Sequence, residues 1–200
     1  MIRVVLAEDQ GMVLGAFASL LDLEEDIEVV ATATNGAEAL AAVRTHRPDV
    51  LLTDIEMPEM SGLDVAKLIH EEGLETRVVM VTTFARTGYL RRAFDAGVSG
   101  YILKDAPIEE MVQALRTVAS GGRVIAPELA VTAWGESDPL TDRERDVLRL
   151  VGEGLPNSEI SERLHLATGT VRNYLSSAIV KLDARNRMEA YTRARDQGYL

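Results

Sequence analysis

The sequence predicts a chain in two parts, a doubly wound (βα)5 α/β domain over residues 1–121 and an all-α domain over residues 139–200, joined by a linker over residues 122–138. Two observations support this prediction. In the first part, five short apolar runs alternate with longer stretches whose apolar residues recur at helical spacing. From Leu140 onward the strand-like runs stop and only short helical patterns remain. A length of 200 residues agrees with one or two domains.

The five apolar runs predict the strands of the first part. A continuous apolar run without alternation is typical of a strand covered on both faces, as in a parallel sheet. The third run is the clearest, because it ends on the carboxylate of Asp54 and is broken soon afterwards by Pro58. The predicted strands cover residues 2–7, 27–33, 49–54, 77–82 and 99–103.

The segments between these runs predict helices. In the fifth helix, the apolar residues that begin with Ile108 follow the i, i+3, i+4, i+7 spacing, and Gly121 ends the pattern. The other helices are predicted over residues 11–23, 36–46, from Gly62 to about residue 72, and 86–96. Five strands that alternate with five helices indicate the flavodoxin-like strand order 2-1-3-4-5, which places the first and third strands side by side.

The second part begins after a linker that contains Pro127 and Gly135 and leaves room for a short helix over residues 128–134. Thr141 and Glu144 have the spacing of a capping box at the start of a helix, which Gly154 ends. Three further helices are predicted over residues 158–166, over residues 168–182 with Thr168 as the N-cap, and over residues 186–197.

The composition favours a cytoplasmic protein without membrane insertion. The chain has no cysteine, and its first apolar run is interrupted at residue 8, which does not suit a signal peptide. The uncharged run at residues 11–21 is shorter than the ~20 residues of a membrane-spanning helix. The net charge of −11 is uneven, because residues 139–200 hold ten Lys/Arg and nine Asp/Glu. Since local patches decide affinity for phosphates, the acidic total does not exclude a nucleic-acid partner for this part.

Polar and charged side chains follow the predicted strands at the edge where ligands bind in open α/β sheets. Glu8 and Asp9 follow the first strand, and Asp54, Thr82 and Lys104 stand at the ends of the third, fourth and fifth. Two like charges ~4 Å apart repel by ~4 kcal/mol at an effective dielectric constant near 20, so three carboxylates need more than one ammonium. We expect a hard divalent cation with oxygen ligands, Mg²⁺ above all, to neutralise the remaining negative charge.

These residues resemble the pattern of two-component response regulators of the NarL/LuxR (FixJ) family, and the resemblance covers nearly the whole chain. The receiver pattern of that family comprises an acidic pair, an acceptor Asp, a Thr or Ser, an aromatic residue and a Lys with a nearby Pro. It falls on Glu8, Asp9, Asp54, Thr82, Tyr101, Lys104 and Pro107. Stretches such as residues 7–10, 54–58 and 82–86 look similar to regulators of desaturase-controlling, membrane-fluidity systems.

The resemblance implies that a sensor histidine kinase transfers a phosphoryl group to Asp54. Mg²⁺ would be held by Glu8, Asp9, Asp54 and the backbone carbonyl of Glu56. Lys104 would pair with the phosphoryl oxygens, and Thr82 and Tyr101 would act as a switch. Thr83 departs from the small residue that is usual at this position, which predicts tighter access for small phosphoryl donors.

The resemblance also implies that the helix over residues 168–182 reads the major groove of double-stranded DNA. Its outward residues resemble the family stretch, with Arg172 in place of a Lys and Tyr174 in place of a His. The predicted contacts are Thr168, Thr170, Arg172, Asn173, Ser176, Ser177 and Lys181. A small domain of charge +1 should bind DNA weakly, so we expect phosphorylation to produce a homodimer on a pseudo-palindromic site.

Two other functions use the same features. An Asp-nucleophile phosphatase of the haloacid-dehalogenase type also combines Mg²⁺ with an α/β sheet, but it needs a second Asp where Glu56 stands, and no substrate-cap insertion is visible. A phosphorylation-switched module could instead dock a partner protein through its C-terminal helices. Phosphatase turnover or the absence of DNA binding would distinguish these functions from transcription regulation.

Overall fold

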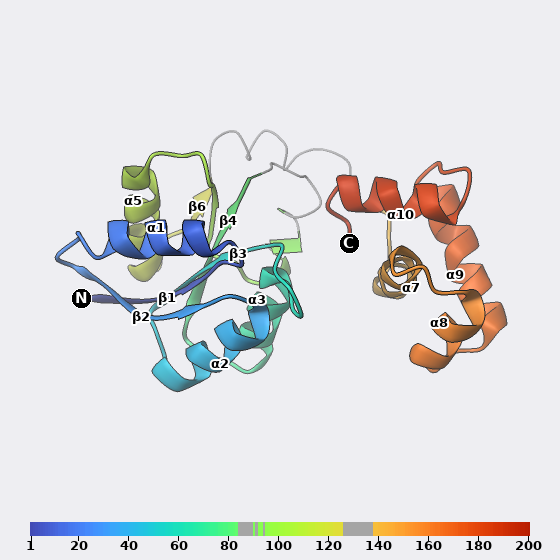
Figure 1. Ribbon diagram of the computed structural model, residues 1–200, viewed down its shortest axis with the longest axis horizontal. Coiled ribbons are helices and arrows are strands. Elements are labelled where there is room, and N and C mark those ends of the chain that lie inside the picture. Colours follow the sequence, from blue (N-terminus) through green and yellow to red (C-terminus); the bar gives the residue numbers. More distant parts are fainter. Residues whose placement is uncertain (84–89, 91, 94, 126–137) are drawn as a thin grey trace. The chain divides into compact units, whose positions relative to one another are not determined.

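The structure is a computed structural model that describes residues 1–83, 90, 92, 93, 95–125 and 138–200 of the chain. Its contacts divide the chain into two compact units. Among the described residues, the first unit contains those up to Ile125 and the second contains residues 138–200. Figure 1 shows strands and helices in the first unit and helices alone in the second. The α/β class followed by an all-α class is therefore as predicted.

The first unit is built on a parallel six-stranded sheet with the order β2-β1-β3-β4-β5-β6. The predicted order 2-1-3-4-5 is confirmed, with one further strand at the edge. In register, Ala7 of β1 lies beside Thr53 of β3, so the residues that follow these strands meet at one edge. The strands are β1 Ile2–Ala7, β2 Ile27–Ala33, β3 Val50–Asp54, β4 Arg77–Thr82, β5 Gly100–Leu103 and β6 Val124–Ile125.

Strand β6 was missed in the sequence, where residues 124 and 125 fall in the predicted linker. Val124 and Ile125 pair in parallel with Gly100 and Tyr101 of β5. Two residues are too few to show a strand period, although both are β-branched and suit a strand. The short helix expected over residues 128–134 lies outside the described residues, as does most of the first half of the helix expected over residues 86–96.

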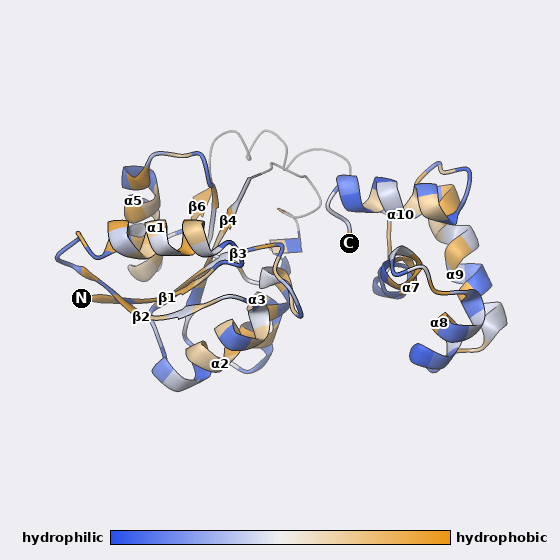
Figure 2. Ribbon diagram, viewed as in Figure 1, coloured by the Kyte–Doolittle hydropathy of each residue, from blue (hydrophilic) through white to orange (hydrophobic). Residues whose placement is uncertain are grey.

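Helices cover both faces of the sheet. The helices of this unit with complete bounds are α1 Gly11–Leu21, α2 Gly36–His46, α3 Gly62–Glu71 and α5 Ile108–Ala119. On one face, Leu14 and Phe17 of α1 pack with Met111 and Leu115 of α5 against β1, β3 and β4. On the other face, α2 contacts β1, β2 and α3. Figure 2 shows β1 as an apolar strand between these layers, which explains its continuous hydrophobic run.

The second unit consists of α7 Asp142–Gly152, α8 Asn157–Arg163, α9 Thr168–Lys181 and α10 Arg187–Asp196 around one apolar core. The predicted capping box of Thr141 and Glu144 is present at the start of α7. Gly154 has a φ of +84°, which is readily adopted by glycine, and it follows the end of α7 as predicted. The N-cap of α9 was predicted wrongly, because Ala167 occupies that position and Thr168 is the first helical residue. No helix in the described ranges combines the length and apolarity needed to span a membrane.

Candidate functional site

The carboxylates of Glu8, Asp9 and Asp54 form a cluster at the carboxyl edge of the sheet, as predicted. One oxygen of each lies within 4.8 Å of one oxygen of each of the others. Glu8 and Asp54 are buried, whereas Asp9 is exposed. The cluster results from the pairing of β1 with β3, which brings the residues after Ala7 beside the end of β3.

Lys104 supplies the positive charge of this cluster. Its Nζ lies 2.7 Å from Oε2 of Glu8 and donates a hydrogen bond of 2.8 Å to Oδ2 of Asp54. The Lys104 amide donates to the carbonyl of Thr82, which fixes the segment after β5 against the end of β4. The side chain of Lys104 is only 9% exposed. One ammonium is therefore shared by two buried carboxylates, and the third carboxylate faces solvent.

The electrostatics of the cluster favour binding of a further cation. Burial raises the pKa of Asp54, although its hydrogen bond with Lys104 acts in the opposite direction. Burial and the nearby charge of Asp54 likewise raise the pKa of Glu8, again against the effect of Lys104. Burial alone would lower the pKa of Lys104, but its bonds with Asp54 and Glu8 outweigh it, so this pKa is raised. The two buried acids are thus incompletely neutralised.

The backbone holds Asp54 in a defined position at the end of β3. Its Oδ1 accepts a hydrogen bond of 2.7 Å from the Ile55 amide, and its carbonyl accepts one of 2.9 Å from Thr53 Oγ1. A Cβ at Gly62 would lie 2.0 Å from the Asp54 carbonyl oxygen, so only glycine allows α3 to begin this close to β3. Oδ2 is left to meet Lys104.

Three further predicted site residues differ in their exposure. Thr82 is buried at the end of β4, where it pairs with Leu103 of β5. Tyr101 is buried within β5, and Glu56 is exposed in the segment after β3. The proximity of Thr82 to the cluster follows from the bond between its carbonyl and the Lys104 amide. The switch roles of Thr82 and Tyr101 stay predictions.

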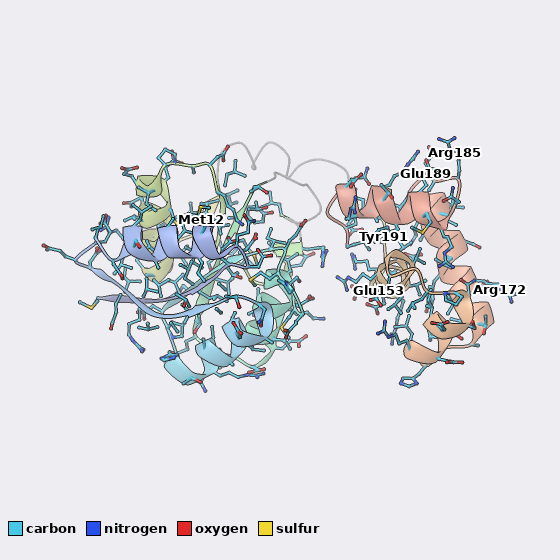
Figure 3. All side chains as sticks on the ribbon, viewed as in Figure 1. Met12, Glu153, Arg172, Arg185, Glu189 and Tyr191 are labelled. Carbon is cyan, nitrogen blue, oxygen red and sulfur yellow. The ribbon has the colours of Figure 1, made fainter. Side chains whose placement is uncertain are left out.

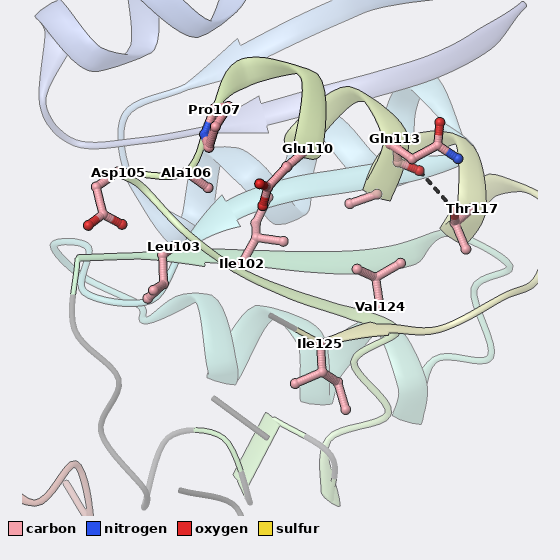
Figure 4. A pocket seen from close by; sticks show the side chains of 11 residues that line it. Ile102, Leu103, Asp105, Ala106, Pro107, Glu110, Gln113, Thr117, Val124 and Ile125 are labelled. Carbon is pink, nitrogen blue, oxygen red and sulfur yellow. Dashed lines mark hydrogen bonds between the residues drawn. The ribbon is translucent and has the colours of Figure 1, made fainter. Parts of the chain in front are cut away.

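The donor set of the cluster suits a hard divalent cation. Carboxylate oxygens are the ligands that Mg²⁺ and Ca²⁺ prefer, and here three acids meet with one ammonium among them. Glu8, Asp9 and Asp54 are the residues that would hold such an ion. A separate cavity of about 460 Å³ lies beside β5, α5 and β6 and is lined by residues such as Asp105 and Glu110 (Figure 4). None of the three clustered acids lines this cavity.

In the second unit, helix α9 presents a polar surface. Val171, Leu175 and Ala178 are buried in the core of the unit. Arg172 extends outward from the unit (Figure 3). Of the predicted DNA contacts, the exposed residues are Arg172, Asn173, Ser176 and Lys181, and the half-buried ones are Thr168, Thr170 and Ser177.

Three of the predicted DNA contacts already have partners within the unit. Lys181 Nζ donates a hydrogen bond of 2.7 Å to Oε2 of Glu144, and Ser177 lies close enough to Glu144 to lower the pKa of its carboxyl group. Thr168 Oγ1 lies 3.3 Å from Oγ of Ser161 in α8. Sequence reasoning identified Glu144 only as a capping residue. Its contact with Lys181 joins positions 37 residues apart, for which the sequence carries no local signal.

Comparison with known proteins gives the class to which this architecture and site belong. Residues 4–116 match the family model of the response regulator receiver domain, and residues 138–194 match that of bacterial regulatory proteins, luxR family. The chain therefore belongs to the response regulators that join a phosphorylatable receiver domain to a luxR-type DNA-binding domain. The prediction of a transcription regulator rather than an enzyme is confirmed, and the phosphatase alternative is not favoured.

Individual relatives match the chain over nearly its whole length. The "Transcriptional regulatory protein DesR" of Bacillus subtilis (strain 168) is 48% identical over 199 residues, covering 100% of this chain and 99% of the relative. The "Oxygen regulatory protein NreC" of Staphylococcus carnosus (strain TM300) is 34% identical and covers 94% of each chain. The crystal structure of the response regulator ChrA of a heme-sensing two-component system is 32% identical, with a TM-score of 0.59 over 100% of this chain and 98% of that one. An RcsB–DNA complex, at 22% identity, a TM-score of 0.66 and coverage of 97% and 98%, shares the fold.

Proposed function

We propose that this chain is switched by phosphorylation of Asp54 and regulates transcription through helix α9. The observation that carries the proposal is the position of Asp54. Its carboxylate stands at a buried strand end, within 4.8 Å of two other carboxylates and 2.8 Å from the Lys104 ammonium. An isolated surface acid that caps a helix would have none of these neighbours.

The chemical step we propose is an in-line phosphoryl transfer from a phosphohistidine of a sensor histidine kinase. An oxygen of Asp54 attacks the phosphorus, a P–O bond forms, and the P–N bond breaks with its electron pair passing to the imidazole. Lys104, already bonded to Oδ2, is placed to pair with the transferred group. Buried Thr82 would donate its hydroxyl to a phosphoryl oxygen, and buried Tyr101 would form the second element of the switch.

We propose Mg²⁺ as the cofactor, held by Glu8, Asp9, Asp54 and the carbonyl of Glu56. Two buried acids share one ammonium, so the ion would neutralise the remaining negative charge and that of the incoming phosphoryl oxygens. The exposed side chain of Asp9 leaves this cluster open to an ion from solvent.

We further propose that exposed residues of α9 bind the major groove of double-stranded DNA. Arg172 and Asn173 have the side chains that most often read guanine and adenine edges, and Thr170 and Ser176 suit phosphate or base contacts. Thr168, Ser177 and Lys181 completed the predicted set, but their internal bonds make them weaker candidates. We propose a cytoplasmic location, because a regulator that binds DNA acts where the DNA lies.

Homodimerisation on a pseudo-palindromic site would supply the affinity that one domain lacks. Helix α1 is a suitable surface, because it has no charged residue while residues 1–138 carry eleven Lys/Arg and twenty-three Asp/Glu. Met12 in the first turn of this helix is 88% exposed, and Leu20 near its end is also exposed. Two strongly acidic domains repel least where neither presents a charge.

Phosphorylation of the purified chain tests the central proposal. Incubation with a phosphoryl donor and Mg²⁺ should add one phosphoryl mass to the wild type and none to the Asp54→Asn variant. Asp49→Asn is the matched control, because Asp49 precedes the same strand at the opposite edge of the sheet. It should leave the mass gain intact. Both acetyl phosphate and a histidine kinase are needed as donors, since Thr83 in place of a small residue predicts tighter access for acetyl phosphate. Labelling of Asp54→Asn equal to wild type would refute the assignment.

A further inference from the structure

The carboxylate of Glu144 is the central acceptor of the second unit. Glu144 is 3% exposed, and its Oε2 accepts hydrogen bonds of 2.7 Å from both the Thr141 amide and Nζ of Lys181. Ser177 lies close enough to this carboxylate to lower its pKa. The bond from Thr141 belongs to the capping box of α7, whereas the bond from Lys181 comes from α9. One buried charge therefore joins the start of α7 to the last turns of α9.

The contact of Lys181 with Glu144 restricts the rotation of α9. Ser177 and Lys181 are four residues apart, so they lie on one line along the helix. Ser176 precedes Ser177 by one residue, which places it about 100° around the helix axis, on the line that also contains Arg172. Holding Ser177 and Lys181 against Glu144 thus sets the direction in which Arg172 and Ser176 project.

Most cations of the second unit are neutralised within it. Eight of the ten Lys/Arg residues in 139–200 have a carboxylate partner within 4.0 Å. Arg187 instead bonds to Asn157 and to the carbonyl of Leu155. Among the described residues, no hydrogen bond or ion pair engages Arg172. Helix α9 therefore carries two cations of different kinds. Lys181 is paired with the buried carboxylate of Glu144, whereas Arg172 has no partner among the described residues.

We propose that Glu144 is a positioning residue for DNA recognition, which holds Lys181 and Ser177 against α7 and leaves Arg172 as the cation of α9 that meets DNA. The inference rests on the proposed DNA-binding function and refines it. Lys181 then acts through Glu144 on the orientation of α9, and it does not neutralise a phosphate.

The salt dependence of binding separates a phosphate contact from a positioning residue. Each phosphate contact that is lost reduces the slope of log affinity against log salt concentration by about 0.9 on duplex DNA. A positioning residue leaves this slope unchanged but lowers the ratio of specific to non-specific affinity, because the base contacts are misplaced. Partial unfolding of a variant lowers both affinities by the same factor, so neither the slope nor the ratio responds to it.

The experiment uses the full chain and two duplexes of equal length, one selected from random sequences by the wild type and one scrambled. Binding is measured by fluorescence anisotropy between ~50 and ~200 mM salt. Lys181→Met should keep the wild-type slope and lose about tenfold in the affinity ratio, the size of one lost base contact. Arg172→Met, the matched loss of one charge on the same helix, should lower the slope by about 0.9 for each bound chain.

Glu144→Gln tests the acceptor itself, because Gln keeps the capping geometry and loses the charge. It should lower the affinity ratio as Lys181→Met does. Glu153→Gln removes a carboxylate from the exposed pair with Arg163 just beyond the end of α7, and it should keep the wild-type ratio. A slope for Lys181→Met that falls as far as that of Arg172→Met would overturn the inference, and so would a wild-type ratio for Glu144→Gln. Failure of the wild type to select any duplex from the random sequences would instead reject the proposed function.

Discussion

Replacing Glu144 by Gln should destabilise the second unit at neutral pH and much less at pH 3. Burial alone raises the pKa of Glu144, but hydrogen bonds from Lys181, Ser177 and Thr141 outweigh it and lower the pKa to about 2. The folded unit therefore binds this proton more weakly than the unfolded chain does. The stabilisation is complete above the ordinary carboxyl pKa and is lost as the pH falls toward 2.

The magnitude follows from the two pKa values of Glu144. The lowering from 4.5 in the unfolded chain to about 2 in the folded unit is equivalent to about 3 kcal/mol of unfolding free energy at neutral pH. Linkage gives a loss of about 2 kcal/mol of this by pH 3. Glu144→Gln should therefore lower the unfolding free energy by about 3 kcal/mol at pH 7 and by about 1 kcal/mol at pH 3.

Urea titrations followed by NMR measure this difference in the intact chain. The amide signals of Val147 and Val171 report on the second unit alone, because both residues lie in its core. Glu153→Gln serves as the control, since its exposed pair with Arg163 should contribute little at either pH. A loss for Glu144→Gln that is equal at pH 3 and pH 7 would show that its charge is not the cause, and the reasoning would be wrong.

Three other variants test the first unit. Asp54→Asn should raise the melting temperature at pH 7.5 without Mg²⁺, because burial raises the pKa of Asp54 and its charge opposes folding above that pKa. Each kcal/mol gained in unfolding free energy should raise the melting temperature by about 4 °C, and calorimetry at pH 4.5 should show a smaller rise. Gly62→Ala should lower the unfolding free energy by about 1–3 kcal/mol and slow phosphorylation of Asp54, since its Cβ would lie 2.0 Å from the Asp54 carbonyl oxygen. Gly15→Ala is the control, because a Cβ there would have nothing within 4 Å and should not lower the unfolding free energy. Urea titration measures the unfolding free energy, and mass spectrometry measures the rate of phosphorylation. Met12→Glu should weaken dimerisation of the phosphorylated chain at least about tenfold, as measured by light scattering, because it places a charge on α1. Thr45→Glu on α2 is the control. Equal dimerisation of the two variants would exclude α1 as the dimer surface.

The acidic cluster was predictable because each of its members is a strand-end residue. Runs such as Val50–Asp54 begin with consecutive buried apolar residues and end on polar ones, so their ends can be read directly from the sequence. Topological rules for parallel sheets then place the first and third strands side by side, which brings Asp9 to Asp54. The predicted convergence needed no knowledge of packing, and the structure confirms it.

The features that the sequence did not reveal depend on tertiary contacts. Val124 and Ile125 become a strand only because the edge of β5 is open to them. Thr168 has the residue type of an N-cap, but its hydroxyl lies beside Ser161 and the helix begins one residue earlier than its type suggests. Lys181 follows the outward pattern of a DNA contact, and only the folded unit brings it to Glu144.

The two units use charge in opposite ways, and this difference accounts for their separate tasks. In the first unit, one ammonium serves two buried acids, so the cluster retains negative charge that a divalent cation would neutralise. In the second unit, internal pairs neutralise most of the cations, so its net charge of +1 comes with very few groups free to meet phosphates. Weak non-specific affinity follows from the second condition. Such a unit would need a second copy on the same DNA to bind tightly, and the proposed pairing through the first unit would then control DNA binding.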